Sequence, residues 1–333
     1  MRTAEHSDRN HLAVFAVAVL SLAATAALPI SAQAAIFCAE PPVLTEPRVY
    51  EGKCPEEAGG PAAVVHSGDV LIKLPTNKVC EGSINIARAR NVWITGGSIA
   101  FDISKAAVTN YFDGRKAVIT VKESSGTTFI EGLDVDAKGT SADAIRALMH
   151  TGRLVIQNTR IHGVSGRTTG PHGDTTHAQA GGPLFALVLQ NVSAFTGYQG
   201  LFTPYRVANG HGTRKLKLQR VNFGYDPNIP LSSKPLKLMF IGSASETVNR
   251  SPDRGTSLSH VYVDVSVWQQ RLPGFSYQKA IFPVPSPQPD GCAIFDPADK
   301  IWGQACGGNP PDGDFAPAER VGLAYDRAYF CRN

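Results

Sequence analysis

The stretch VWITGGSI at residues 92–99 is the first of five similar units in the middle of the chain. The others are TFIEGLDV at 128–135, LVIQNTRI at 154–161, LVLQNVSA at 187–194 and LKLQRVNF at 216–223. Each unit has a short run rich in β-branched residues or Leu, then a polar–small pair, then a second short run. Between Ile94 and Leu218 the equivalent residues are 36, 26, 33 and 29 positions apart. Such repeats predict stacked turns, each burying its apolar residues against the next.

The repeat favours an all-β fold, a right-handed parallel β-helix with disulfide-tied terminal caps. A β-sandwich or propeller is the competing fold, but sandwiches carry tight hairpin signals every 8–12 residues. The one Asn-Gly pair is Asn209-Gly210. Helical periodicity is nearly absent, and residues 141–150 are the best candidate for a helical turn. The equivalent pairs Gln157-Asn158 and Gln190-Asn191 are expected to stack as amides at a bend between sheets.

The N-terminus predicts export. Residues 12–28 are apolar and uncharged, and Ala32 and Ala34 form the A-x-A pattern of a secretory signal cleaved near Ala34. A membrane anchor is the alternative, but the run is short for a bilayer span. The Ala-rich leader looks bacterial, so we expect a secreted or periplasmic protein.

The rest of the chain divides by composition. We expect a signal peptide at 1–34, an N-terminal cap at 35–80, the β-helix at 81–270 and a C-terminal cap or arm at 271–333. The cap segments contain all the cysteines, which are disulfide candidates in an exported chain: Cys38, Cys54, Cys80, Cys292, Cys306 and Cys331. Either one bridge joins the two ends or two thiols stay free, and 15 connectivities are possible. The cysteines lack the spacing of a zinc site.

The net charge of +4 is too small to indicate nucleic acid as a partner, but it permits an acidic one. We expect a monomer without a membrane span in the mature chain.

The densest group of reactive side chains lies at residues 172–182, between two units. Strict strand alternation puts His172 and Asp174 on one face, and His177 and Gln179 on the other. Because these polar groups are costly to bury, we expect a bulge between residues 175 and 176 that turns all four outward.

This segment, HGDTTHAQAGG, resembles the strand found in many exported β-helix proteins of the pectate-lyase-like superfamily. That strand has a His-x-Asp-x-x-Gln run followed by Gln-x-Gly-Gly, and here His177 replaces the first Gln. The resemblance covers roughly residues 60–270. It implies the β-helix fold and a role on polysaccharides, in a superfamily that includes lyases, hydrolases, epimerases and proteins without known activity. At 92–96 the superfamily's Val-Trp-Ile-Asp-His run is only partly matched, so no catalytic role is carried over there.

These residue types suit a lyase that cleaves an acidic, uronate-containing polysaccharide by β-elimination. The reaction needs a cation to neutralise the sugar carboxylate and a base to remove the adjacent proton. We expect His172 or His177 as base, Arg206 as neutraliser and Tyr205 as acid. Asp174 is expected to orient a histidine or hold Ca²⁺, the one cofactor considered. The expected substrate-binding residues are Arg146, His150, Gln179, His211 and Lys215.

Three alternatives stay open. A glycoside hydrolase on the same fold needs two facing carboxylates, for which Asp143 and Asp174 are candidates on different turns. A noncatalytic β-helix that binds glycan or a cell surface is the second. In the third, the His-Asp-His-Gln run is a polar ladder that stabilises the fold without any chemistry.

Overall fold

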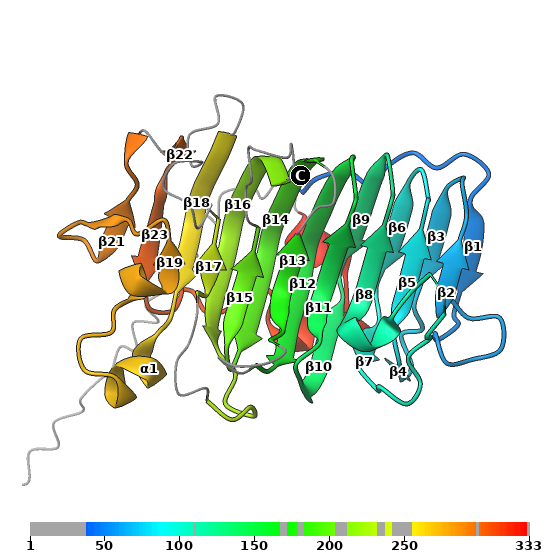
Figure 1. Ribbon diagram of the computed structural model, residues 1–333, viewed down its shortest axis with the longest axis horizontal. Helices are drawn as coiled ribbons and strands as arrows, with labels where there is room; N and C mark the ends of the chain where they lie inside the picture. Colours follow the sequence, from blue (N-terminus) through cyan, green and yellow to red (C-terminus); the bar gives the residue numbers. More distant parts are fainter. Residues whose placement is uncertain are drawn as a thin grey trace, which may run out of the picture. The chain divides into compact units, whose positions relative to one another are not determined.

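The computed structural model describes residues 38–109, 111–166, 172–178, 183–203, 212–231, 237–241, 255–297 and 300–331. These residues belong to one compact unit, Ala35–Asn333. It is an all-β unit, dominated by two sheets of parallel strands (Figure 1).

The larger sheet has 15 strands in the described residues. Its main path is β1 (Arg48–Glu51), β3 (Val70–Lys73), β6 (Val92–Thr95), β9 (Thr127–Glu131), β12 (Arg153–Val164), β14 (Pro183–Thr196), β16 (Gly212–Tyr225), β18 (Gly255–Val263), β23 (Gln304–Gly307), β21 (Cys292–Ile294) and β20 (Ser286–Pro287). Strands β4 (Val79–Glu81), β7 (Ser98–Ala100), β10 (Asp134–Thr140) and β22 (Ile301–Trp302) pair beside this path. Pairing is parallel except among β20, β21 and β23.

The smaller sheet is parallel throughout. Its strands are β2 (Ala63–Val65), β5 (Ile84–Ala87), β8 (Ala117–Lys122), β11 (Asp143–Leu148), β13 (Asp174–Ala178), β15 (Gln199–Phe202), β17 (Met239–Phe240) and β19 (Ile281–Phe282). The chain passes alternately between the two sheets, so each strand pairs with its equivalent one turn later. The expected helical turn at 141–150 is wrong, because strand β11 occupies these residues.

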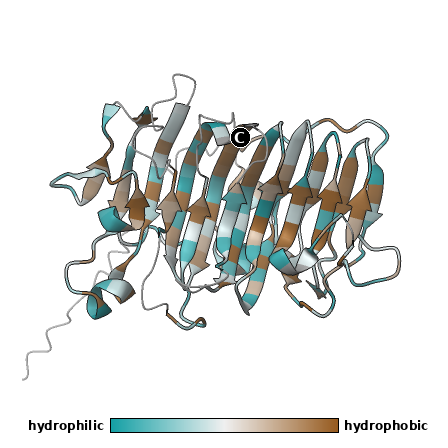
Figure 2. Ribbon diagram, viewed as in Figure 1, coloured by the Kyte–Doolittle hydropathy of each residue, from teal (hydrophilic) through white to brown (hydrophobic). Residues whose placement is uncertain are grey.

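The strand register aligns the five sequence units. Ile94 pairs with Ile130, which pairs with Ile156, and the row continues through Leu189 and Leu218. All five side chains are buried, and each contributes about 1.5–3 kcal/mol by leaving water. Figure 2 shows hydrophobic residues recurring in strand after strand of both sheets.

The polar–small pair of each unit forms a bend in the chain. The residues after the first run are Gly96, Gly132, Asn158, Asn191 and Arg220, and all have a left-handed φ between 49° and 72°. Glycine and asparagine adopt this conformation at least cost. The Asn191 side-chain amide donates to Asn158 Oδ1 at 2.8 Å, and Arg220 Nε donates to Asn191 Oδ1 at 3.0 Å. The amide stack expected from the sequence is therefore present, and an arginine extends it.

Three disulfides tie the ends. Cys38–Cys331 joins the two termini, and Cys54–Cys80 and Cys292–Cys306 each close a loop within one end. The parallel pairing already begins at β1, inside the segment 35–80, and continues past residue 270 through β19 and β22.

The C-terminal segment lies along the bends. Arg160 pairs with Asp314 at 2.9 Å, and Arg327 pairs with the buried Glu131 at 2.9 Å.

The helices are short: α1 (Ser266–Arg271), α2 (Arg327–Phe330), and the 3₁₀ turns η1 (Gly114–Lys116), η3 (Tyr277–Ala280), η5 (Ala318–Arg320) and η6 (Gly322–Ala324). No helix within the described ranges is long and apolar enough to cross a membrane. Three disulfides fit an extracellular or periplasmic protein.

Candidate functional site

One row of side chains on the smaller sheet points away from the core. Its members occupy equivalent positions on seven consecutive strands, and we name them the outer row: Asn85, Thr120, Arg146, His177, Phe202, Phe240 and Phe282. Their neighbours along each strand, such as Ile145 and Leu201, lie in the core cluster. The row is polar at one end and aromatic at the other, with His177 between the two.

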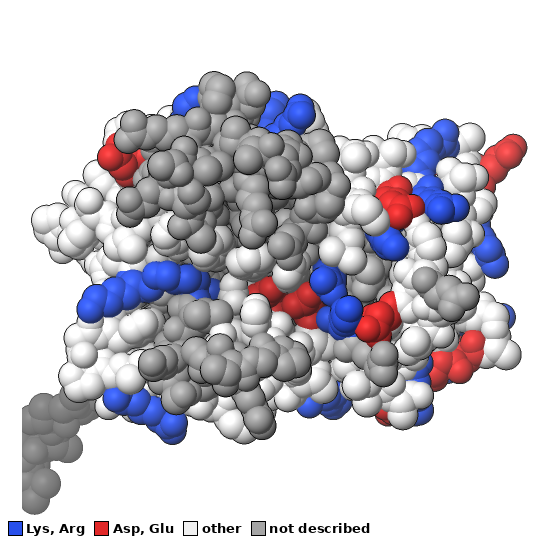
Figure 3. Space-filling model, viewed as in Figure 1, with Lys and Arg blue, Asp and Glu red and all other residues white. Residues whose placement is uncertain are grey.

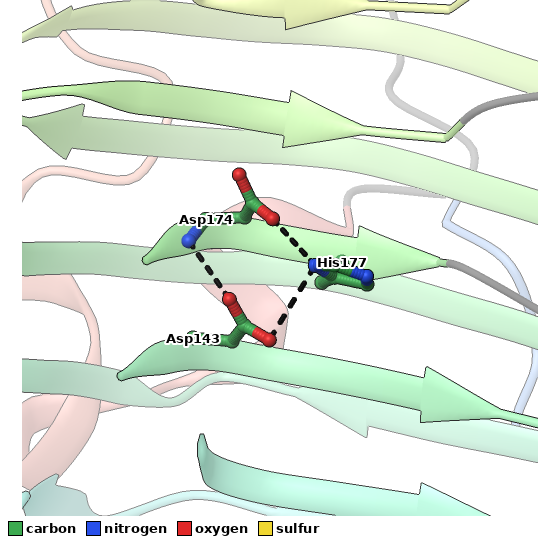
Figure 4. Close-up of side chains that lie close together, drawn as sticks. All are labelled: Asp143, Asp174 and His177. Carbon is green, nitrogen blue, oxygen red and sulfur yellow. Dashed lines mark hydrogen bonds and ion pairs between the residues drawn. The ribbon is translucent and has the colours of Figure 1, made fainter. Parts of the chain in front are cut away.

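Two carboxyl groups meet at His177 (Figure 4). Its Nδ1 lies 2.5 Å from Asp174 Oδ2 and 3.5 Å from Asp143 Oδ2. The backbone N–H of Asp174 donates to Asp143 Oδ1 at 3.0 Å, which links the two turns. Asp174 is fully buried, and the His177 side chain is 11% exposed. Asp174 Oδ1 is buried without a hydrogen-bond partner among the described residues.

Burial and charge set the protonation of this cluster. Burial disfavours a charged imidazole, but the hydrogen bonds and charges of Asp143 and Asp174 outweigh it and raise the pKa of His177 to about 10. For Asp174, burial raises the pKa to about 6, assisted by the charge of Asp143 and opposed by the hydrogen bond from His177. At neutral pH His177 is therefore an imidazolium held by carboxylates.

Arg146 adds a second cation on the outer row. Its Nε lies 3.4 Å from Asp143 Oδ2, and its side chain is 21% exposed. It lines a pocket of about 140 Å³ together with Lys116, Lys122 and Tyr111. Figure 3 shows acidic and basic side chains side by side near the middle of this face. An anionic group in the pocket would therefore meet Arg146, Lys116 and Lys122, although Asp113 also lines the pocket and pairs with Lys116 at 3.5 Å.

The aromatic end continues from His177. The rings of His177 and Phe202 are 5.1 Å apart, Phe202 and Phe240 are 5.1 Å apart, and Phe240 and Phe282 stack at 4.9 Å. The three phenylalanines are partly exposed. They form a continuous apolar strip along the outer row.

The expected outward turn of the whole 172–179 segment is wrong. Strand β13 pairs with β15 in an unbroken register, without the bulge expected between residues 175 and 176. Asp174 is buried, while His172 precedes the strand and is exposed. The two groups meet nevertheless, because Asp174 begins the strand and its carboxyl group reaches the outward His177. Its expected role in orienting a histidine fits this contact.

One expected substrate contact is buried, and another lies on the other sheet. His150 is 1% exposed and has both ring nitrogens engaged, with Thr128 Oγ1 at 2.9 Å and the backbone N–H of Gly152 at 3.0 Å. Burial lowers its pKa to about 4. Lys215 belongs to β16 of the larger sheet and is not part of the outer row. The other expected site residues lie outside the described residues: Gln179, Tyr205, Arg206 and His211.

Ca²⁺ does not fit the cluster well. Asp143, Asp174 and His177 bring three potential ligand atoms within 4.8 Å of one another. Ca²⁺ prefers six to eight oxygen ligands, and imidazole is not among its usual ones. The proton shared between His177 and Asp174 would also have to leave. The imidazolium itself supplies the positive charge between the carboxylates.

Sequence reasoning missed the aromatic strip. Its signal is present, since an apolar residue followed by Phe recurs at 201–202, 239–240 and 281–282, spaced by 38 and 42 residues. Strands this short have no periodicity of their own, so the dipeptides are visible only once the turns are aligned.

No protein-family model matches the chain, and searches of curated proteins and of solved structures give no match.

Proposed function

We propose that the protein is an exported lyase that cleaves an acidic, uronate-containing polysaccharide by β-elimination. We further propose that its two parallel sheets form a right-handed β-helix of the pectate-lyase-like kind. Parallel crossover connections are right-handed in nearly all proteins, and the HGDTTHAQAGG segment supplies the likeness. Export is supported by the leader-like composition of residues 1–34 and by the three disulfides.

The observation that carries the proposal is the composition of the outer row. Cations at Arg146 and His177 suit a sugar carboxylate, and the strip that begins at Phe202 suits the sugar rings. Neighbouring strands are about 4.8 Å apart, so a linear polymer lying across the strands meets one member of the row after another.

β-Elimination requires loss of the proton next to the uronate carboxylate. Its electrons form a carbon–carbon double bond, the adjacent bond to the glycosidic oxygen breaks, and that oxygen takes a proton. Negative charge grows on the carboxylate during this step, where Arg146 and His177 stabilise it. Because His177 is already protonated, its role is neutralisation, and His172 is the better base among the described residues. Tyr205 and Arg206 keep their proposed roles as acid and second neutraliser.

A glycoside hydrolase is the second candidate, favoured by one observation. Asp143 and Asp174 approach the same histidine, and the raised pKa of Asp174 is typical of a carboxylic acid that donates a proton. However, Asp174 is fully buried, and a general acid must contact the glycosidic oxygen. The lyase is therefore preferred.

The test incubates the purified protein with alginate, pectate and glycosaminoglycans, and follows both ultraviolet absorbance of unsaturated uronate and new reducing ends. A lyase raises both signals. Reducing ends without unsaturated product identify a hydrolase, and tight binding without either signal on any polymer identifies a noncatalytic protein.

Variants connect any activity to the outer row. Arg146→Gln should lower kcat/KM about a hundredfold or more, since a cation that stabilises developing charge is lost. Lys138→Gln is the matched control, an exposed cation paired with Asp136, and should leave activity unchanged. Equal activity in the wild type and Arg146→Gln would remove the outer row from the mechanism.

A further inference from the structure

We propose a second binding site for anionic polysaccharide, on the outer face of the larger sheet where β14, β16 and β18 begin beside β22. It rests on the substrate class of the proposed function. It does not depend on which bond, if any, the protein cleaves.

The site is a groove of about 440 Å³ lined by small, aliphatic, aromatic and basic side chains. Strand register orders the lining in two rows. The first runs Arg153, Ala186, Lys215 and Gly255. The second runs Val188, Lys217, Ser257 and Trp302. In each row a small residue follows a lysine, which leaves space beside the ammonium group.

Two large aromatic side chains are exposed at this groove. Trp302 is 59% and Phe185 is 49% exposed, an unusual exposure for residues of this size. The Lys215 ammonium group lies 5.1 Å from the centre of the Phe185 ring. The site thus presents an aromatic face and a cation together, the two features that recognise a sugar ring and its acidic substituent.

Among the described residues, no carboxylate offsets the positive charge of the groove. Arg153, Lys215 and Lys217 line it, and no Asp or Glu is among its described lining residues. None of the three has a carboxylate within ion-pair distance in the described part of the chain. Two strand spacings, roughly 9–10 Å, separate Arg153 from Lys215. This arrangement suits a repeating anion and not a single small one.

Among the described residues, the same face is buried towards the N-terminus and exposed at the groove. Towards the N-terminus the second row continues through Val155 and Phe129, which are buried, with Ala39 and Trp93 packed against them. Beyond Val188 the row changes to Lys217 and Trp302. A surface that is buried in the folded protein would stay apolar along the whole row, whereas at the groove this row becomes cationic and aromatic.

The two sites lie on different sheets whose inner residues share one core cluster. A polysaccharide chain held in the groove would keep the protein on its polymer between cleavage events. The carboxylate of a uronate and the sulfate of a sulfated glycan offer the same chemistry to these cations, so the probes must separate them.

The test measures binding of polygalacturonate, heparin fragments and neutral dextran to the full chain by affinity electrophoresis and calorimetry. Trp302→Ala and the double variant Lys215→Gln/Lys217→Gln should each weaken binding of at least one anionic polymer about tenfold or more. Lys138→Gln should not weaken it. Added salt should weaken binding by the wild type, and much less so by the double variant. Preference for polygalacturonate identifies carboxylate as the anion, and preference for heparin, which carries both groups, shows that sulfate adds to recognition.

Unchanged affinity in both groove variants, or equal affinity for dextran, overturns the second site. Circular dichroism of each variant verifies that it folds, which the exposed positions favour. The outcome is independent of catalysis. If no polymer gives product but Trp302→Ala loses binding, the lyase is refuted and the groove is supported. If product forms but the groove variants bind as the wild type does, the lyase is supported and the groove is refuted.

Discussion

The proton held by His177 makes the stability of the protein depend on pH in a predictable direction. The folded pKa of His177 is about 10, against an ordinary value of 6.5. A group whose pKa is raised by folding stabilises the protein fully below its unfolded pKa, and this contribution is lost as pH rises through the folded value. For His177 the window is about pH 6.5 to 10.

Within that window the folded protein holds up to one proton more than the unfolded chain. Stability therefore falls by up to about 1.4 kcal/mol per pH unit. Between pH 7 and 9 the expected loss is about 2–3 kcal/mol. Folding also raises the pKa of Asp174, from 3.8 to about 6. Stability therefore also falls as pH rises from about 3.8 to 6.

Two assays test this prediction. NMR titration of the histidine side chains should show His177 still protonated at pH 8, and Asp174→Asn should bring its pKa down. Urea unfolding with the disulfides intact should show that the wild type loses free energy of unfolding between pH 7 and pH 9. The His177→Gln variant should not show this loss. That variant is less stable at both pH values because two buried carboxyl groups lose their cation. Deprotonation of His177 near pH 6.5, or equal pH slopes in the two proteins, would refute the reasoning.

Three further predictions follow from the fold and the site. Asn191→Ala should lower the free energy of unfolding by about 3 kcal/mol, because two hydrogen bonds are lost and alanine must adopt a left-handed φ. Asn191→Gly should lower it by less, because glycine adopts this φ without strain. Equal losses for the two variants in urea titrations would argue against backbone strain. Replacing Cys38 and Cys331 by Ala should lower the free energy of unfolding more than replacing Cys292 and Cys306 does, because the two bridges span 293 and 14 residues. The chain-entropy estimates are roughly 5–6 kcal/mol and 3 kcal/mol, respectively. The reverse order in denaturant titrations would contradict this. Chelation with EDTA should leave any activity on polyuronates intact, and an activity restored only by added Ca²⁺ would overturn the imidazolium assignment.

The stacked strands were predictable because each turn repeats the same physical requirement. Every turn needs an aliphatic residue inside, as at Ile130 and Ile156, and a residue tolerant of left-handed φ at the bend, as at Gly132 and Asn158. These requirements recur in the sequence at turn-length intervals, so alignment of the units gave the register. Short helices α1 and α2 carry no such repetition and were not foreseen.

The site was predictable only in part. Spacing placed Arg146 and Asp143 on the turn before His177, which the register bears out. It also placed residues 200–206 on the turn after it, and the register bears this out at Leu201 and Phe202, the described part of that range that pairs with β13. Which side chain is buried was not predictable, since the high cost of burying Asp174 argued for exposure. The contact that compensates for burying Asp174 is an imidazolium shared by two carboxylates. It depends on the positions of side chains on two different turns. For the same reason Lys215 seemed close to the site in sequence but lies on the other sheet.

The most direct test of the outer row is a structure of the protein with an oligouronate bound. The account predicts a sugar carboxylate within ion-pair distance of Arg146, close to His177, and a neighbouring ring against Phe202. An oligosaccharide that occupies only the groove beside Trp302, or no part of the outer row, would contradict it.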